Sequence, residues 1–328
     1  MKLPSRTRPT VLLLSLLAAV PAFAADGPPL VAEAAVTVPD STGGFDFIHI
    51  DASRNRLLAA HTAKGALDVF DLADGKLIKQ IPTGKAQDVE VDKDGGTYLV
   101  SISKEQKIVI IDAEKLEVTG EVKLDGPADA IVFDPKSHEL YAGHDDEKNL
   151  WVIDPKEKKI VTTITIPEAP EVAIYAADLD LVFQNIKSNA TVLAIDPATH
   201  QVKDTWSTAP ATGPHGLAYN PTTGHLFAAG ANQKLAAIDA KTGKPMGSID
   251  IAKGVDEIAF DPDTQRVYCA CSSGKISVAQ DSATGLTAIG EVDSPHGARS
   301  IAYDGKEHAV WVAYSDDKGS HIQRFRVK

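Results

Sequence analysis

The chain has 328 residues, of which 24% are charged and 6% aromatic, and its formal net charge is −12 at pH 7. This acidic balance opposes non-specific binding to nucleic acid or to anionic lipid, and it favours cationic partners. Two cysteines, Cys269 and Cys271, are too few for a disulfide framework.

The first 24 residues have the pattern of a secretory signal peptide. Three basic residues precede an apolar run over 11–20, and the tripeptide AFA at 22–24 is a cleavage signal. The run is too short to span a bilayer. Without this segment, 30 of the 33 Lys and Arg residues remain against 45 Asp and Glu, a net charge of −15. We therefore expect residues 25–328 to be periplasmic or secreted, with no transmembrane segment.

From residue 31 onward, short β-rich runs alternate with turn signals, and no long stretch has a helical period. An apolar run that ends in aspartate recurs at Asp71, Asp112, Asp154, Asp196 and Asp239, with spacings of 41, 42, 42 and 43 residues. A second marker, strand–polar turn–strand, runs in step with it, as in IVFDPKSHELYAGH (131–144). Each unit thus holds four short strands, A to D, and the chain holds seven units. This pattern predicts an all-β, seven-bladed β-propeller.

The last repeat has no D strand of its own after SHIQRFRVK (320–328). The segment LVAEAAVTVP (30–39) has D-strand character and precedes the first A strand. We predict that it completes the last blade and closes the ring, which would leave no open sheet edge. Residues 25–328 would then form a single domain.

The two cysteines lie two residues apart in a predicted strand. Their Cα atoms are therefore about 6.6 Å apart at 3.3 Å per residue, and their side chains leave the same face in parallel. Because this distance is near the upper limit for a disulfide, we predict two free thiols.

Several repeats resemble those of the YVTN / YncE-like β-propeller family, within the WD40-like repeat superfamily. The resemblance rests on GPADAIVFDPKSHELYAG (126–143), APEVAIYAADLDLVFQN (169–185), GVDEIAFDP (254–262) and GARSIAYD (297–304), and it extends over nearly all of residues 25–328. It implies an exported seven-bladed propeller. It implies no particular activity, because propellers host unrelated functions.

Alignment of the repeats places one residue per unit at the start of each A strand, at the mouth of the central channel. This mouth ring consists of Asp46, Gln87, Asp129, Glu171, His215, Asp256 and Arg299. Arg299 should lie between Asp256 and Asp46, and His215 between Glu171 and Asp256. One interpretation is a salt-bridge network that ties the blades together. The other is a recognition site for a cationic or hydroxyl-rich ligand, or for a divalent cation such as calcium.

Two further patterns bear on the mouth. Pro-His-Gly occurs at 214–216 and at 295–297, but only His215 falls in the ring; His296 does not, so the two are not equivalent.

The ends of the B strands form a second set on the same face, namely His61, Ile102, His144, Asn185, Gly230, Cys271 and Tyr314. Within it, His61, His144 and Cys271 are candidate copper or zinc ligands. However, they lie on units one, three and six, and no His-x-x-His or Cys-x-x-Cys spacing supports a site.

Two functions remain open. In the first, the protein is a non-enzymatic binding scaffold, expected to be a monomer without a cofactor, that meets a small molecule or protein partner through the channel mouth. In the second, it is a divalent-metal-dependent hydrolase or lactonase-like enzyme, by analogy with propeller lactonases. Four carboxylates (Asp46, Asp129, Glu171 and Asp256) would then hold the ion, and His215 would act as the base.

Overall fold

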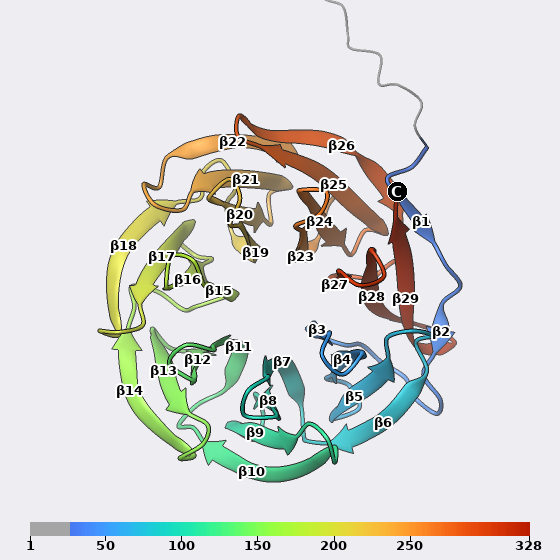
Figure 1. The fold of residues 1–328 in the computed structure, drawn as a ribbon, viewed down its shortest axis with the longest axis vertical. Helices are drawn as coiled ribbons and strands as arrows, with labels where there is room; N and C mark the ends of the chain where they lie inside the picture. Colours follow the sequence, from blue (N-terminus) through green and yellow to red (C-terminus); the bar gives the residue numbers. More distant parts are fainter. Residues whose placement is uncertain (1–26) are drawn as a thin grey trace, which may run out of the picture.

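Seven antiparallel sheets surround a central channel in the computed structural model, which describes residues 27–328 (Figure 1). In six of the sheets the strands run outward in chain order from the channel to the perimeter, as units of A to D strands require. The described residues contain no helix. The prediction of an all-β, seven-bladed propeller is therefore confirmed. The predicted signal peptide, residues 1–24, lies outside the described residues.

The first six blades are each built from four consecutive strands. Blade one holds β3 (Ile48–Asp51), β4 (Arg56–His61), β5 (Ala66–Asp71) and β6 (Leu77–Pro82). Blade two holds β7 (Ala86–Asp92), β8 (Thr97–Ile102), β9 (Lys107–Asp112) and β10 (Glu117–Lys123). Blade three holds β11 (Ala128–Asp134), β12 (Glu139–His144), β13 (Asn149–Asp154) and β14 (Lys159–Thr165).

Blades four to six repeat the arrangement. Blade four holds β15 (Ala173–Ala176), β16 (Leu181–Ile186), β17 (Thr191–Asp196) and β18 (Gln201–Ser207). Blade five holds β19 (Pro214–Asn220), β20 (His225–Gly230), β21 (Lys234–Asp239) and β22 (Pro245–Asp250). Blade six holds β23 (Val255–Asp261), β24 (Arg266–Cys271), β25 (Lys275–Ser282) and β26 (Gly285–Asp293).

The seventh blade combines the two ends of the propeller. It holds β27 (Ser300–Asp304), β28 (Ala309–Asp316), β29 (Gly319–Val327), β1 (Leu30–Ala32) and β2 (Val36–Thr37). Both β1 and β2 pair antiparallel with β29, so that Leu30 lies opposite Val327 and Val36 opposite Ile322. The N-terminal segment thus takes the place of the missing D strand, as the sequence predicts.

The aspartates that mark the repeat cap turns. After a C strand, Asp71 Oδ1 accepts a hydrogen bond from the backbone N–H of Ala73 at 2.8 Å. After an A strand, Asp134 Oδ1 accepts one from the N–H of Lys136, also at 2.8 Å. Such Asx turns mimic a backbone turn and reverse the chain within a few residues. The regular spacing of aspartate therefore marks the position of the turn in each hairpin.

The hydrophobic core is divided among the blade interfaces. The B and C strands are almost wholly buried, because each inner strand packs against a neighbouring blade on both faces, whereas the outer D strands are largely exposed. Seven apolar clusters result, one between each pair of adjacent blades, including the pair formed by blades seven and one. The ring is therefore closed by hydrophobic packing as well as by strand pairing. Within residues 27–328, no helix has the length and hydropathy of a membrane span.

Candidate functional site

The mouth ring lies where the A strands begin. Its members in strands are Gln87, Asp129, His215 and Asp256, in β7, β11, β19 and β23. Arg299 directly precedes β27, whereas Asp46 and Glu171 lie two residues before β3 and β15. Backbone hydrogen bonds join neighbouring A strands here: Phe47 N–H donates to the Gln87 carbonyl and Glu257 N–H to the Arg299 carbonyl, both at 3.0 Å. These hydrogen bonds therefore hold the ring residues of successive blades at a similar height along the channel.

Gly216, the last residue of the first Pro-His-Gly, permits the close approach of two blades. A Cβ atom on this glycine would lie 2.9 Å from the Asp256 carbonyl oxygen and 3.1 Å from the Ile258 nitrogen. The second Pro-His-Gly is instead part of a turn, where Gly297 has a φ of 83°. The two Pro-His-Gly sequences are not equivalent, as the repeat alignment predicts.

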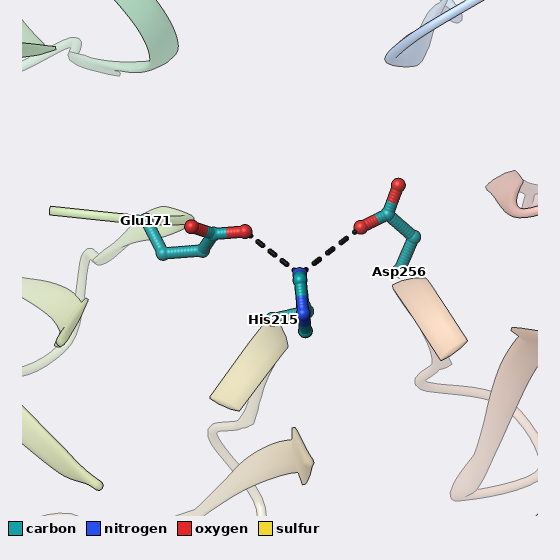
Figure 2. A group of neighbouring side chains, drawn as sticks. All are labelled: Glu171, His215 and Asp256. Atoms are coloured by element: carbon teal, nitrogen blue, oxygen red, sulfur yellow. Dashed lines mark ion pairs between the residues drawn. The ribbon is translucent and has the colours of Figure 1, made fainter. Parts of the chain in front are cut away.

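Ion pairs run through one half of the mouth ring. His215 Nδ1 lies 2.7 Å from a Glu171 carboxylate oxygen and 3.2 Å from one of Asp256 (Figure 2). Arg299 continues the series, with its guanidinium 3.1 Å from Asp256 and 3.4 Å from Asp46. We call these five residues the paired half. Acid and base alternate along it, and each base bridges the acids of the two neighbouring blades.

Two carboxylates flank the imidazole of His215. Neither carboxylate oxygen meets the geometry of a hydrogen bond to Nδ1, although both lie close to it. The contacts with Asp256 and Glu171 raise the pKa of His215 from 6.5 to about 9. In Asp256, burial raises the pKa, but His215 and Arg299 outweigh it, so the pKa lies below its ordinary value. His215 is thus an imidazolium at neutral pH, and its contribution to stability is lost as the pH rises through about 9.

The rest of the ring has one acid, Asp129, without a matching base. Asp129 accepts a hydrogen bond from the Gln87 side-chain amide at 3.1 Å and, among residues 27–328, forms no ion pair. Burial and the nearby Asp145 raise the pKa of Asp129 to about 6. Burial and the charge of Asp129 raise the pKa of Asp46 to about 7, although Arg299 opposes this shift. We call Gln87 and Asp129 the open half.

Arg299→Ala should lower stability in two pH-dependent steps. Asp256 has a folded pKa below 3.8 and stays ionised above about pH 4, whereas Asp46, with a pKa of about 7, is ionised only above that pH. The loss should therefore be largest above pH 7, smaller between pH 4 and 7, and smallest below pH 4. Because Arg299 is 46% exposed, solvent screens the pairs, and we expect about 1 kcal/mol or less. Thermal unfolding across this range measures the effect; an equal loss at every pH would contradict the ion pairing.

The structure does not bring the candidate soft-metal ligands together. His61 Nδ1 lies 2.7 Å from Asp68 in the core, and the ring of His144 stacks on Trp151. Among residues 27–328, the only three acidic, His or Cys side chains placed to hold one ion are Glu171, His215 and Asp256, whose candidate ligand atoms all lie within 4.8 Å of one another. Asp46 and Asp129 are not in this group.

Both cysteines are buried and free, as the sequence predicts. Burial raises the pKa of Cys271 to about 11. Because the thiolate is the form that binds metals, a thiol that stays protonated at neutral pH is a poor ligand.

The sequence analysis missed a group of ionisable side chains inside the channel. Asp88, Glu90 and Glu257 lie below the mouth ring on β7 and β23, and His49 lies near them on β3. The signal was present as charged residues within the apolar A strands QDVEVD (87–92) and DEIAFD (256–261). Such residues are rare in buried strands unless they are paired or functional.

Comparison with solved structures defines the class of this protein as a seven-bladed β-propeller. The chain superimposes on a chain of a mitotic checkpoint complex with a TM-score of 0.78 at 15% identity, covering 97% of this chain and 99% of the other. The RRP9 WD40 repeats give 0.77 at 10% identity, with coverage of 91% and 100%. A chain of the hydrazine synthase of Kuenenia stuttgartiensis gives 0.75 at 14%, with coverage of 89% and 98%. At these identities the likeness concerns the fold alone.

Sequence comparison adds information on the family to this likeness in fold. The chain is 25% identical over 163 residues to the uncharacterized protein YncE of Salmonella typhimurium and 24% identical to that of Salmonella typhi, in each case over 47% of this chain and 45% of the relative. The match thus spans about half the length of these curated relatives. No family model matches the chain. This weak homology and the seven-bladed ring together support a YncE-like β-propeller family for this protein.

Proposed function

We propose that residues 25–328 form one exported, non-enzymatic propeller domain that binds a cationic ligand, or a basic segment of a partner protein, at the channel mouth. The signal-peptide pattern over 1–24 and the net charge of −12 favour an exported protein with cationic partners. The open half of the mouth ring carries the proposal.

We expect a cationic ligand to bind Asp129 in preference to the other ring acids. The Asp129 carboxylate is partly buried and has an amide partner but no base. Burial raises its pKa, and repulsion from Asp145 and neighbouring ring acids raises it further. A bound cation would relieve this repulsion and would also attract Asp46. The paired half offers less, because its acids already have basic partners: His215 and Arg299 in the ring, and Lys187, which lies 3.3 Å from Glu171.

Calorimetric titration with a tetralysine peptide at neutral pH and low salt tests the proposal. We expect binding that weakens with added salt and that Asp129→Asn weakens about tenfold, equivalent to 1.4 kcal/mol. Asp250→Asn is the matched control, since Asp250 is an exposed acid on the outer strand β22 and its loss changes the net charge equally. Absence of binding, or equal effects of the two variants, would contradict the proposal.

A metal-dependent hydrolase is the second candidate, favoured by the convergence of Glu171, His215 and Asp256. An ion at this cluster would need to displace the proton that holds His215 between the two acids. The imidazolium is also unable to act as a base at neutral pH, because its pKa is about 9. Stoichiometric metal in the purified protein, together with lactone hydrolysis that Glu171→Gln abolishes, would favour this candidate over the first.

A further inference from the structure

Below the mouth ring, the channel contains a cavity of about 360 Å³ between the A strands. Most of its lining residues are apolar, Ile131, Leu217 and Ile301 among them, and the others include three carboxyl groups but no lysine or arginine. The only basic lining residue is His49, whose charge acts on Glu90. The cavity therefore holds three carboxyl groups and lacks a resident cation that balances all of them. Burial raises the pKa of all three, and a bound cation would favour their ionised form.

One of these acids has a carboxylate oxygen without a hydrogen-bond partner. Glu257 is 8% exposed, and its Oε2 accepts a hydrogen bond from the Ile301 N–H of the next blade at 2.7 Å. Its Oε1 is buried and has no hydrogen-bond partner among the described residues. Bridging the two blades needs only Oε2. A buried acceptor left unpaired is costly, so Oε1 is suited to a ligand donor.

The second acidic point lies on another blade. Asp88 is 7% exposed, and its carboxylate oxygens accept hydrogen bonds from Ile131 N–H at 2.9 Å and Val89 N–H at 2.7 Å. Glu90 lies two residues further along β7 and also lines the cavity. Since β7 and β23 face one another across the channel (Figure 1), the cavity has acids on opposite walls.

The separation of the acids on opposite walls favours a ligand with two cationic groups over a single metal ion. A divalent ion needs several oxygens around one point, and these three acids are not among the described residues whose ligand atoms converge. A linear ligand with a cation at each end matches acids on opposite walls, and its methylene chain would pack on the apolar residues between them. Ammonium groups also supply the N–H donors that Glu257 Oε1 lacks.

We propose that the channel cavity binds a linear aliphatic diamine, with one ammonium group at Glu257 and the other at Asp88 and Glu90. This site is distinct from the mouth ring and does not depend on the function proposed for the ring. A ligand would reach it through the mouth.

Calorimetric titration of residues 25–328 with 1,4-diaminobutane and 1,6-diaminohexane tests the proposal. At least one diamine should bind about tenfold or more tightly than butylamine, which has a single ammonium group, and 1,4-butanediol should not bind. This comparison uses the unaltered protein, so it does not depend on whether a variant folds. Equal binding of butylamine and the diamines, or no diamine binding, would overturn the proposal.

Variants then locate the site. Glu257→Gln keeps a carbonyl acceptor for the Ile301 N–H but cannot ionise to pair with an ammonium group, and it should weaken diamine binding about tenfold. Glu117→Gln, on the exposed outer strand β10, is the matched control and should change nothing. If Asp129→Asn abolishes diamine binding while Glu257→Gln leaves it intact, the ligand binds at the mouth, which would refute the channel site and leave the mouth proposal standing.

Discussion

Deletion of residues 27–38 should abolish the single cooperative unfolding transition of the propeller. The deletion removes β1 and β2, which pair with β29, and two of its residues, Leu30 and Val38, are 1% exposed. It also removes Glu33, whose carboxylate pairs with Arg324 and Arg326 of β29. The edge of the last blade would then be exposed to solvent.

The size of this effect follows from the buried side chains. Truncating a single buried leucine to alanine costs about 2–5 kcal/mol. Two buried apolar residues and a strand ladder therefore approach the whole stability of a typical domain, about 5–15 kcal/mol. We expect the truncated protein to melt broadly and at a much lower temperature, or to aggregate through the free edge of β29.

Calorimetry and circular dichroism on matched truncations measure this effect. A protein that begins at residue 27 is the control, because it keeps both closing strands. If the protein that begins at residue 39 melts as sharply, and at the same temperature, as this control, the N-terminal segment does not hold the ring closed.

Asp68→Ala should cost about 3–5 kcal/mol, the typical penalty for removing one partner of a buried ionisable pair. Asp68 and His61 have fully buried side chains, with Oδ2 of the acid 2.7 Å from Nδ1 of the histidine. The other carboxylate oxygen accepts a hydrogen bond from the Gln80 amide at 2.8 Å, and His61 Nε2 lies 3.1 Å from Ser320 Oγ of β29. This network therefore connects the first blade to the last.

The alanine variant would leave His61 buried without its carboxylate partner and would remove one acceptor of the half-buried Gln80 amide. Urea unfolding at neutral pH gives the change in the free energy of unfolding. Asp293→Ala is the matched control, because Asp293 pairs with Lys275 but is 90% exposed, and exposed pairs contribute little. Equal stability of the two variants would show that the buried network does not stabilise the closure.

Much of the fold is determined by interactions that are local in the sequence. The aspartates at 71, 112, 154, 196 and 239 recur because each caps its own turn, with acceptor and donor two or three residues apart. The apolar runs between them mark strands buried on both faces. The blade count, the four strands of each of the first six blades and the closing role of residues 30–39 could therefore be predicted without knowledge of any long-range contact. That the closing segment is divided into two short strands, β1 and β2, was not predicted.

Side-chain contacts between blades were only partly predictable. The repeat alignment places Arg299 between Asp256 and Asp46, and the structure has both ion pairs. It treats all four ring carboxylates alike, however, whereas only two of them converge on His215. Whether the ring binds a ligand stays a prediction.

The tertiary structure alone decided the acidic cavity and the free oxygen of Glu257. Asp88 and Glu257 are 169 residues apart in the sequence, and closure of the ring brings them into one channel. Their environment depends on the side-chain conformations and on which backbone N–H of the next blade each carboxylate meets. A repeat pattern fixes the position of a residue along its own strand, but the partners of a buried charge lie on other blades, and only the closed ring sets their distances.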